Sequence, residues 1–249
     1  MKTLFVGQNL ISLEKINSTN RYAQQLLEQN ENALEGTVIT AKEQVEGRGQ
    51  RGNNWEAEAD KNLTLSIILK PNFLSIDKQF QLNKMISLAI FDFIKLKINE
   101  QVSVKWPNDI YIGNKKVAGI LIENILRQNK ITQTVVGIGI NVNQIIFSDE
   151  NKNAISLKML TEFDFDLDEC LQLLCECVEA RYFQLKANTK KIDEDYLNNL
   201  FQFNLFKNYK IGTALVYAKI KDISELGKLI LENSEHQIFE CDLKEIIFC

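Results

Sequence analysis

Residues 105–123 read KWPNDIYIGNKKVAGILIE, and this stretch sets the pattern of the predicted fold. Pro107 to Asp109 interrupt an apolar run, which predicts a rigid corner that presents an amide and a carboxylate. Gly113-Asn114 predicts a turn between the two apolar segments that follow. Gly119 would weaken the second of these strands unless another group must approach the backbone there. The stretch therefore predicts short antiparallel strands with polar groups at their ends.

Apolar segments on both sides of this stretch extend the same pattern. Strands are expected at residues 37–42, 63–69, 102–105, 110–112, 117–123 and 132–142. The segment 135–142, VVGIGINV, has glycines at alternate positions and a polar Asn141 in an apolar run. A sheet face opened by glycines beside a basic loop suits a flat apolar ligand joined to a phosphate. We therefore expect a ligand site on the face of this sheet.

Three helices are predicted from capping residues followed by apolar positions three and four residues apart. The first follows the N-capping residues 18–20, the second is long and begins at Asp77, and the third begins at a capping box formed by Asp166 and Glu169. Strands occur in runs rather than in strict alternation with helices. The predicted fold class is therefore α+β, with a mixed central sheet and flanking helices.

The pattern changes near residue 191. A short helical piece is followed by three short β segments near residues 213–223, 227–232 and 237–248. They form a compact all-β module, which is small enough to be marginal alone and which we expect to dock on the main body. We therefore predict two domains, residues 1–190 and 191–249.

Composition and charge are those of an ordinary globular protein. The 249 residues include 29 basic and 33 acidic side chains, and the net charge of −4 gives no overall field to attract nucleic acid. No segment approaches the ~18 apolar residues of a membrane span. The five cysteines are an odd number without a sign of export, so we expect a cytoplasmic protein with reduced thiols. Because His236 is the single histidine, a multi-histidine metal site is excluded, and we expect no protein-bound metal.

Residues 47–52, GRGQRG, contain a literal G-x-G-x-x-G. A dinucleotide cradle needs a helix that opens at the third glycine, but residues 53–62 are few for a parallel crossover before the next strand. The Gly-Lys-Ser/Thr ending of a P-loop is absent as well. The motif therefore predicts neither of these nucleotide cradles.

Two arginines lie among these glycines, and we call residues 47–55 the arginine loop. The guanidinium groups of Arg48 and Arg51 match the oxygens of phosphate and carboxylate groups, and glycines let backbone N–H groups approach an anion. Trp55 could belong to the core or could stack on a base. The arginine loop therefore predicts an anion site, and the alternative is a solvated hairpin without a ligand.

Taken together, these stretches resemble the biotin protein ligases. The resemblance covers residues 18–20, 47–55, 105–123 and 137–141 in the family's order and spacing, and it extends over most of residues 10–145. The β module at the end is similar to the family's small SH3-like barrel domain. The resemblance implies a fold like that of the class II synthetases and an ATP-dependent ligase. Biotin reacts with ATP to form biotinyl-AMP, and the acyl group then passes to a lysine of a biotin carboxyl carrier domain.

The resemblance also implies a role for each matching residue. The implied catalytic residues are Lys116 between the biotin carboxylate and the α-phosphate, Arg48 in the loop that closes over the ligand, and Asp109 in positioning or deprotonating the incoming lysine. The other implied ligand-binding residues are Ser18, Thr19, Asn20 and Gln44 toward biotin, Gly49, Gln50 and Arg51 in the loop, Trp55 and Asn141 toward adenine, Asn108 near the acyl-phosphate, and Gly119 in its strand. Gln50 departs from the family, which often has arginine at this position, so we expect Arg48 and Arg51 to retain the adenylate.

Partners and alternatives follow from the same resemblance. Mg²⁺ should arrive with the ATP phosphates rather than in a dedicated cage. Only 17 residues precede Ser18, too few for a helix-turn-helix, so we expect no binding to DNA. An exposed edge of the central sheet could pair two subunits into a homodimer. Two alternatives stay open, namely a lipoate or octanoate ligase of the same fold and a non-catalytic biotin-binding relative.

Overall fold

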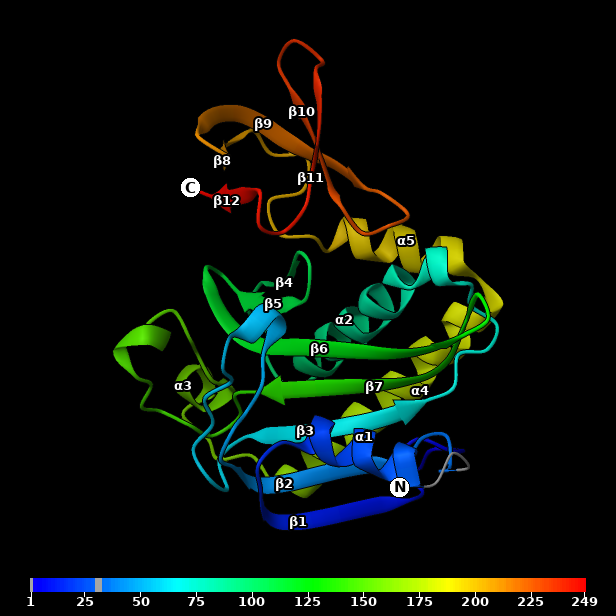
Figure 1. Ribbon diagram of the computed structural model, residues 1–249. Helices are drawn as coiled ribbons and strands as arrows, with labels where there is room; N and C mark the ends of the chain where they lie inside the picture. Colours follow the sequence, from blue (N-terminus) through cyan, green and yellow to red (C-terminus); the bar gives the residue numbers. More distant parts are fainter. Residues whose placement is uncertain (1, 30–32) are drawn as a thin grey trace.

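The computed structural model describes residues 2–29 and 33–249, and within them it contains a seven-stranded sheet and a five-stranded sheet, one above the other (Figure 1). The larger sheet has the strand order β1-β2-β3-β7-β6-β5-β4. Its strands are β1 (Leu10–Ile16), β2 (Val38–Gln44), β3 (Leu63–Leu69), β4 (Val102–Lys105), β5 (Asp109–Ile112), β6 (Lys115–Arg127) and β7 (Lys130–Ile140). Strands β1 and β2 are parallel and the other neighbours are antiparallel. The predicted mixed sheet and the predicted antiparallel strands, here β4 to β7, are therefore confirmed.

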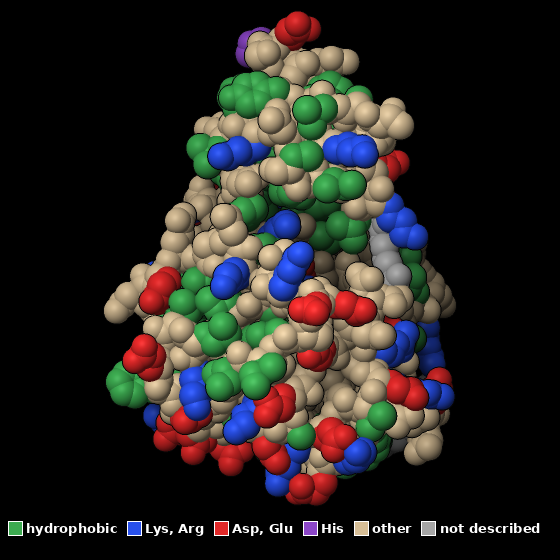
Figure 2. Space-filling model, turned by 90° about the vertical axis from the view of Figure 1, so that its left-hand side faces the viewer, with side chains coloured by type: hydrophobic (Ala, Val, Ile, Leu, Met, Phe, Trp, Pro, Cys, Tyr) green, Lys and Arg blue, Asp and Glu red, His purple; other side chains and the backbone are tan. Residues whose placement is uncertain are grey.

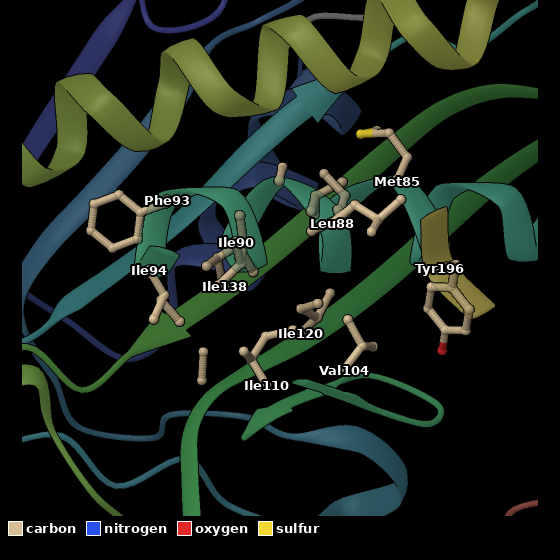
Figure 3. Close-up of a cluster of buried hydrophobic side chains, with 14 of the residues drawn as sticks. Met85, Leu88, Ile90, Phe93, Ile94, Val104, Ile110, Ile120, Ile138 and Tyr196 are labelled. Carbon is tan, nitrogen blue, oxygen red and sulfur yellow. The ribbon is translucent and has the colours of Figure 1, made fainter. Parts of the chain in front are cut away.

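Helices cover both faces of this sheet. Helices α2 (Phe80–Lys95) and α4 (Leu167–Ala187) lie on one face, and α1 (Thr19–Gln29) lies on the other (Figure 1). The apolar positions of α2 recur every three or four residues, and Figure 3 shows them packed over Ile120 and Ile138 of the sheet. None of the helices in the described ranges combines the length and the hydropathy that a membrane crossing requires.

The start of α2 differs from the prediction. Asp77 lies in a separate 3-10 turn, Ile76–Lys78, and α2 begins after Gln79, which makes no side-chain cap. The carboxylate of Asp77 is hydrogen-bonded to Ser75, and this bond lowers its pKa. Asp77 therefore lies inside a local turn and does not cap the long helix, because the 3-10 turn places it too far ahead of the first α-helical residues.

The smaller sheet is formed by the C-terminal module, in the order β11-β10-β9-β8-β12. Its strands are β8 (Lys207–Ile211), β9 (Ala214–Ile223), β10 (Leu229–Asn233), β11 (Ile238–Cys241) and β12 (Ile246–Phe248). The sequence predicted three segments here and missed β8, in which only Tyr209 is fully buried. The segment 237–248 is two strands, because a turn at 242–245 sends β12 to the opposite edge of the sheet from β11.

The C-terminal module packs directly against the larger sheet. Trp106 Nε1 donates a hydrogen bond of 2.8 Å to the carbonyl oxygen of Gly227, at the turn between β9 and β10. Gly227 has φ +85°, and a Cβ there would lie 2.6 Å from Cγ of Phe80 and still closer to Cδ2, so only glycine fits this contact. One hydrophobic core joins both sheets. The predicted boundary between residues 190 and 191 falls inside α5 (Thr189–Asn198), and it stays a prediction.

Candidate active site

A cavity of about 550 Å³ lies between the larger sheet, the arginine loop and the C-terminal module. In Figure 2 its opening is a hollow with Lys and Arg side chains around it. The predicted residues that line it are Ser18, Thr19, Asn20, Gln44, Arg48, Gly49, Gln50, Trp55, Asn108, Asp109, Lys116 and Gly119. Asn141 is buried next to the lining rather than in it, and the side chain of Arg51 lies outside the described part of the structure. The volume is within the range of about 300–1,000 Å³ typical of small-molecule sites.

One end of the cavity is formed by the start of α1. The side-chain amide of Gln44 is held by Thr19, because Gln44 Oε1 accepts hydrogen bonds from Thr19 N at 2.8 Å and from Thr19 Oγ1 at 3.1 Å. Asn20 Oδ1 accepts a bond of 2.6 Å from Ser66 Oγ, and Asn20 Nδ2 donates to Glu123 Oε2 at 2.8 Å. Thr19, Asn20 and Ser66 are almost fully buried, while Gln44 and Glu123 are partly exposed, so the network fixes polar groups at this end. Sequence reasoning missed Ser66, whose position inside an apolar strand was the available signal.

The arginine loop is a folded hairpin over the cavity. Trp55 N donates to Gly47 O at 2.9 Å, and Gly49 N donates to Asn53 O at 2.7 Å. Arg48 Nη1 lies 3.6 Å from Glu123 Oε1, so one carboxylate contacts both the loop and the Asn20 amide. Glu123 thus links the mouth of the cavity to its buried end.

Glycines on the sheet make room for side chains of the protein itself. A Cβ at Gly139 would lie 2.6 Å from Cζ2 of Trp55, and a Cβ at Gly119 would lie 3.0 Å from Cζ3 of the same ring. Gly119 and Gly139 are directly paired in the sheet, so they form one platform for the indole. A Cβ at Gly137 would lie 2.9 Å from Cγ of Asn20. The indole and the Asn20 amide therefore cover part of the glycine face, but Gly119, Gly137 and Gly139 also line the cavity, so the ligand site on this face stays a prediction.

The corner at Pro107 to Asp109 carries the central charge pair. The Trp106–Pro107 peptide bond is cis. Asn108 Nδ2 donates to Ile120 O at 2.6 Å, and this bond holds the corner against β6. Asp109 Oδ1 lies 2.7 Å from Lys116 Nζ, with both side chains partly exposed to the cavity. Lys116 Nζ also lies 5.6 Å from the Trp55 ring centroid, so the ammonium group is close to both the carboxylate and the indole.

Lys105 supplies a second cation and was not singled out from the sequence. Its Nζ lies 4.6 Å from the ring centroid of Tyr111 and 5.1 Å from that of Phe248, and it donates to Tyr111 Oη at 3.2 Å. Burial lowers the pKa of Lys105, and the nearby charge of Lys116 adds to this effect, while Asp109 opposes it. Burial also raises the pKa of Tyr111 to about 12, so its phenol stays protonated.

The segment 148–155 supports three parts of the site at once. Glu56, next to Trp55, accepts hydrogen bonds from Ser148 Oγ at 2.5 Å and Asn151 Nδ2 at 2.6 Å, and these bonds lower the pKa of Glu56. Lys116 N donates to the carbonyl oxygen of residue 153 at 2.8 Å. Asn141 Nδ2 donates to that of residue 155 at 3.2 Å, while the buried Asn141 Oδ1 has no hydrogen-bond partner among the described residues. Asn141 therefore keeps a buried acceptor unsatisfied next to the cavity.

The C-terminal module also contributes to the cavity. Its lining residues are Leu243, Lys244, Ile246, Ile247 and Phe248. Lys244 is exposed and has no ion pair within the described residues. No sequence signal pointed to these residues, because their position depends on how the module packs against the larger sheet.

Comparisons with known proteins identify the family of this chain. Residues 12–141 match the model of the biotin/lipoate A/B protein ligase family. The chain is 32% identical to the bifunctional ligase/repressor BirA of Bacillus spizizenii, over 98% of this chain and 76% of that protein. It is 33% identical to the biotin–[acetyl-CoA-carboxylase] ligase of Paracoccus denitrificans, over 52% of this chain and 53% of that protein. A solved structure of the Aquifex aeolicus biotin protein ligase in complex with biotin and ATP has a TM-score of 0.79 and 28% identity, covering 97% of this chain and 99% of that chain. The chain therefore belongs to the biotin/lipoate A/B protein ligase family, and within it to the biotin protein ligases.

Proposed function

We propose that this ligase activates biotin as biotinyl-5′-AMP and transfers the biotinyl group to a lysine of a biotin carboxyl carrier domain. The observation that carries the proposal is the Lys116–Asp109 pair, held 2.7 Å apart between a polar end and an aromatic end of one cavity. Such an arrangement can bring a carboxylate and a nucleotide phosphate together at a fixed cation.

The polar end of the cavity is the proposed biotin site. The ureido group of biotin both donates and accepts hydrogen bonds, and Ser18, Thr19 and Gln44 offer groups of both kinds there. Asn20 is already bonded to Ser66 and Glu123, so it contributes mainly by holding this end rigid. A lipoyl or octanoyl chain ends in groups that form no comparable hydrogen bonds. A buried polar end left unpaired by such a chain disfavours it, and this supports biotin over the lipoate alternative.

The aromatic end is the proposed adenine site. The Trp55 indole offers a face for stacking, and the unsatisfied Asn141 Oδ1 can accept a hydrogen bond from the exocyclic amine of adenine. The A. aeolicus ligase, whose solved structure contains biotin and ATP, supports the presence of both substrates in one cavity. Mg²⁺ enters with ATP as part of the nucleotide substrate.

The first step is attack of a biotin carboxylate oxygen on the α-phosphorus of ATP. A new P–O bond forms, and the bond to the pyrophosphate breaks. The ammonium group of Lys116 lowers the repulsion between carboxylate and phosphate as they approach, and Asp109 holds that ammonium in place. Arg48 lies at the mouth of the cavity and retains the acyl-adenylate by contact with its phosphate.

The second step is attack of a lysine amine on the acyl carbon, with AMP as the leaving group. The amine loses a proton as the amide bond forms. Once Lys116 has moved onto the phosphate, the carboxylate of Asp109 is free to position the amine or to accept its proton. The name of the P. denitrificans ligase identifies acetyl-CoA carboxylase as its substrate, which supports a carboxylase carrier domain as the acceptor here. A homodimer and a cytoplasmic location stay predictions.

The test is biotin-dependent exchange of labelled pyrophosphate into ATP, followed by the mass of a carrier domain after incubation with both substrates. We expect exchange with biotin and none with lipoate, and a mass increase of one biotinyl group on the carrier. Lys116→Ala should abolish exchange while leaving the fold intact, as judged by circular dichroism. A protein that binds biotin without exchange would be the non-catalytic relative, and exchange that depends on lipoate would identify the other acyl ligase.

A further inference from the structure

The outer face of the C-terminal sheet exposes a group of apolar side chains. This outer patch consists of Phe206, Leu215, Tyr217 and Ile247. The relative exposures are 68% for Leu215, 59% for Tyr217 and 59% for Ile247, although β9 and β12 are regular strands. The Phe206 and Tyr217 rings stack with centroids 5.4 Å apart, so the patch is a continuous surface. Large exposed apolar patches with polar rims mark interaction sites on soluble proteins.

Strand register places one lysine in the middle of the outer patch. Lys210 of β8 is paired with Ile247 of β12 on one side and with Leu215 of β9 on the other, so the three side chains share one row. Lys210 is exposed and has no ion pair within the described residues. Lys219, farther along β9, lies 5.7 Å from the Phe206 ring centroid, but its Nζ also lies 3.5 Å from Glu232 Oε2, so the unpaired positive charge of the patch comes from Lys210. The outer patch is therefore apolar with positive charge, which complements an apolar surface that carries a carboxylate.

The outer patch continues into the mouth of the proposed active site. Ile247 belongs to the patch and also lines the cavity, and the exposed Lys244 lies two residues before β12 at the same opening. In Figure 2 hydrophobic side chains gather on the upper part of this face, with Lys and Arg side chains on both sides and the hollow below them. A macromolecule whose lysine enters the cavity must rest on the surface around this opening.

We propose that the outer patch docks the acceptor domain, through an apolar surface bordered by carboxylates, so that its lysine enters the cavity past Ile247. This rests on the proposed function, because only the transfer step needs a protein acceptor. A second copy of this chain fits less well, because a symmetric contact would bring Lys210 of both copies together and repulsion would oppose it. The two reaction steps should therefore separate, with adenylation independent of the outer patch and transfer dependent on it.

Two substitutions at exposed positions of the outer patch test the docking site and leave the catalytic side chains unchanged. Lys210→Glu reverses the central charge, and Leu215→Asp places a carboxylate in the apolar surface. Each is assayed for pyrophosphate exchange and for transfer to a biotin carboxyl carrier domain of acetyl-CoA carboxylase. We expect exchange within about twofold of the unmodified enzyme and a rise in KM for the carrier of about tenfold or more, as for residues at the centre of an interface.

Ile238→Asp is the matched control, since Ile238 is 49% exposed on β11 at the opposite edge of the same sheet from β12. It should leave both steps unchanged. Carrier variants with a surface carboxylate changed to lysine should restore transfer by Lys210→Glu, which a merely structural effect would not allow. An unchanged KM for the carrier in both patch variants would overturn the proposal, and so would a dimer in solution that both variants dissociate. Absence of exchange in the unmodified protein would instead overturn the proposed function, and the docking site with it.

Discussion

Gly139→Ala is the substitution whose effect the geometry defines most closely. A Cβ at this position would lie 2.6 Å from both Cζ2 and Nε1 of Trp55. Ordinary carbon contacts need about 3.5 Å, so the indole must move by about 1 Å away from the sheet. The backbone of Gly139 does not have a positive φ, so alanine can adopt the same backbone conformation. Its paired residues in the sheet are Gly119 and Thr64. The strand itself therefore accepts alanine, and the effect falls on the position of the indole.

The expected size of this effect follows from the cost of overpacking. We expect adenine to stack on the Trp55 indole in the position that the indole has in this structure. In Gly139→Ala, nucleotide binding must then push the indole against the new methyl group. Overpacking of this kind costs about 1–3 kcal/mol, which corresponds to a loss of nucleotide affinity of about 5- to 150-fold. The assay is the KM for ATP in biotin-dependent pyrophosphate exchange, together with the Kd for biotin alone from calorimetry.

Gly137→Ala is the matched variant on the same strand. Its Cβ would lie 2.9 Å from Cγ of Asn20, at the proposed biotin end, and not against the indole. We expect it to raise the Kd for biotin and to change the KM for ATP much less, while Gly139→Ala does the reverse. The reasoning would be refuted if a folded Gly139→Ala enzyme kept its normal KM for ATP, or if both variants weakened both substrates equally.

Four further predictions rest on single contacts. Asp109→Asn leaves its ammonium partner without a counter-ion, and the rate of pyrophosphate exchange should fall by about 10- to 100-fold at unchanged biotin affinity. Arg48→Ala should let the acyl-adenylate escape, which is measured as biotin on bystander proteins, and unchanged selectivity would count against its role. The Glu56 carboxylate has a lowered pKa in the folded protein, so its hydrogen bonds to Ser148 and Asn151 contribute fully above the unfolded pKa and are lost as pH falls through the lowered value. Protease cleavage in the arginine loop should therefore increase on acidification. Glu56→Gln should remove this pH dependence. Glu179→Gln replaces a carboxylate that accepts hydrogen bonds from the backbone N–H groups of residues 4–6. The free energy of unfolding should drop by about 1.5–3 kcal/mol, as measured in a denaturant titration.

Local chemistry explains which parts of the fold were predictable. The run at 63–69 coincides with β3, because an apolar segment that ends at proline has few other solutions. Asp166 accepts a hydrogen bond from Glu169 N and starts α4 as its capping pattern indicates. Asp77 has the same chemistry but lies within a 3-10 turn and caps no helix, because its neighbours form a different local structure. Patterns of a few residues therefore give the kind of element more reliably than its first residue.

Contacts between distant segments explain what the sequence did not reveal about the site. Glu123 contacts Arg48 and Asn20, which are separated from it by many residues, and nothing in its own strand marks it as a link between them. Lys244 lines the cavity because the C-terminal module packs against the larger sheet, and the Trp106–Gly227 hydrogen bond is one contact of that packing. Such residues acquire their position from packing, so they become visible only when the two sheets are placed together.

The alternate glycines of β7 show how one strand can order two substrates. Gly137 and Gly139 point to the same face and are about 7 Å apart, since a strand rises about 3.4 Å per residue. Asn20 lies over the first and Trp55 over the second, while Lys116 lies next to Gly119, the partner of Gly139 across the sheet. The glycines therefore set the spacing between a polar half and an aromatic half, with the ammonium group at the aromatic side of the boundary. A side chain at either glycine would displace one half without moving the other. For that reason, an alanine at one of these positions should weaken the binding of one substrate and leave the binding of the other nearly unchanged.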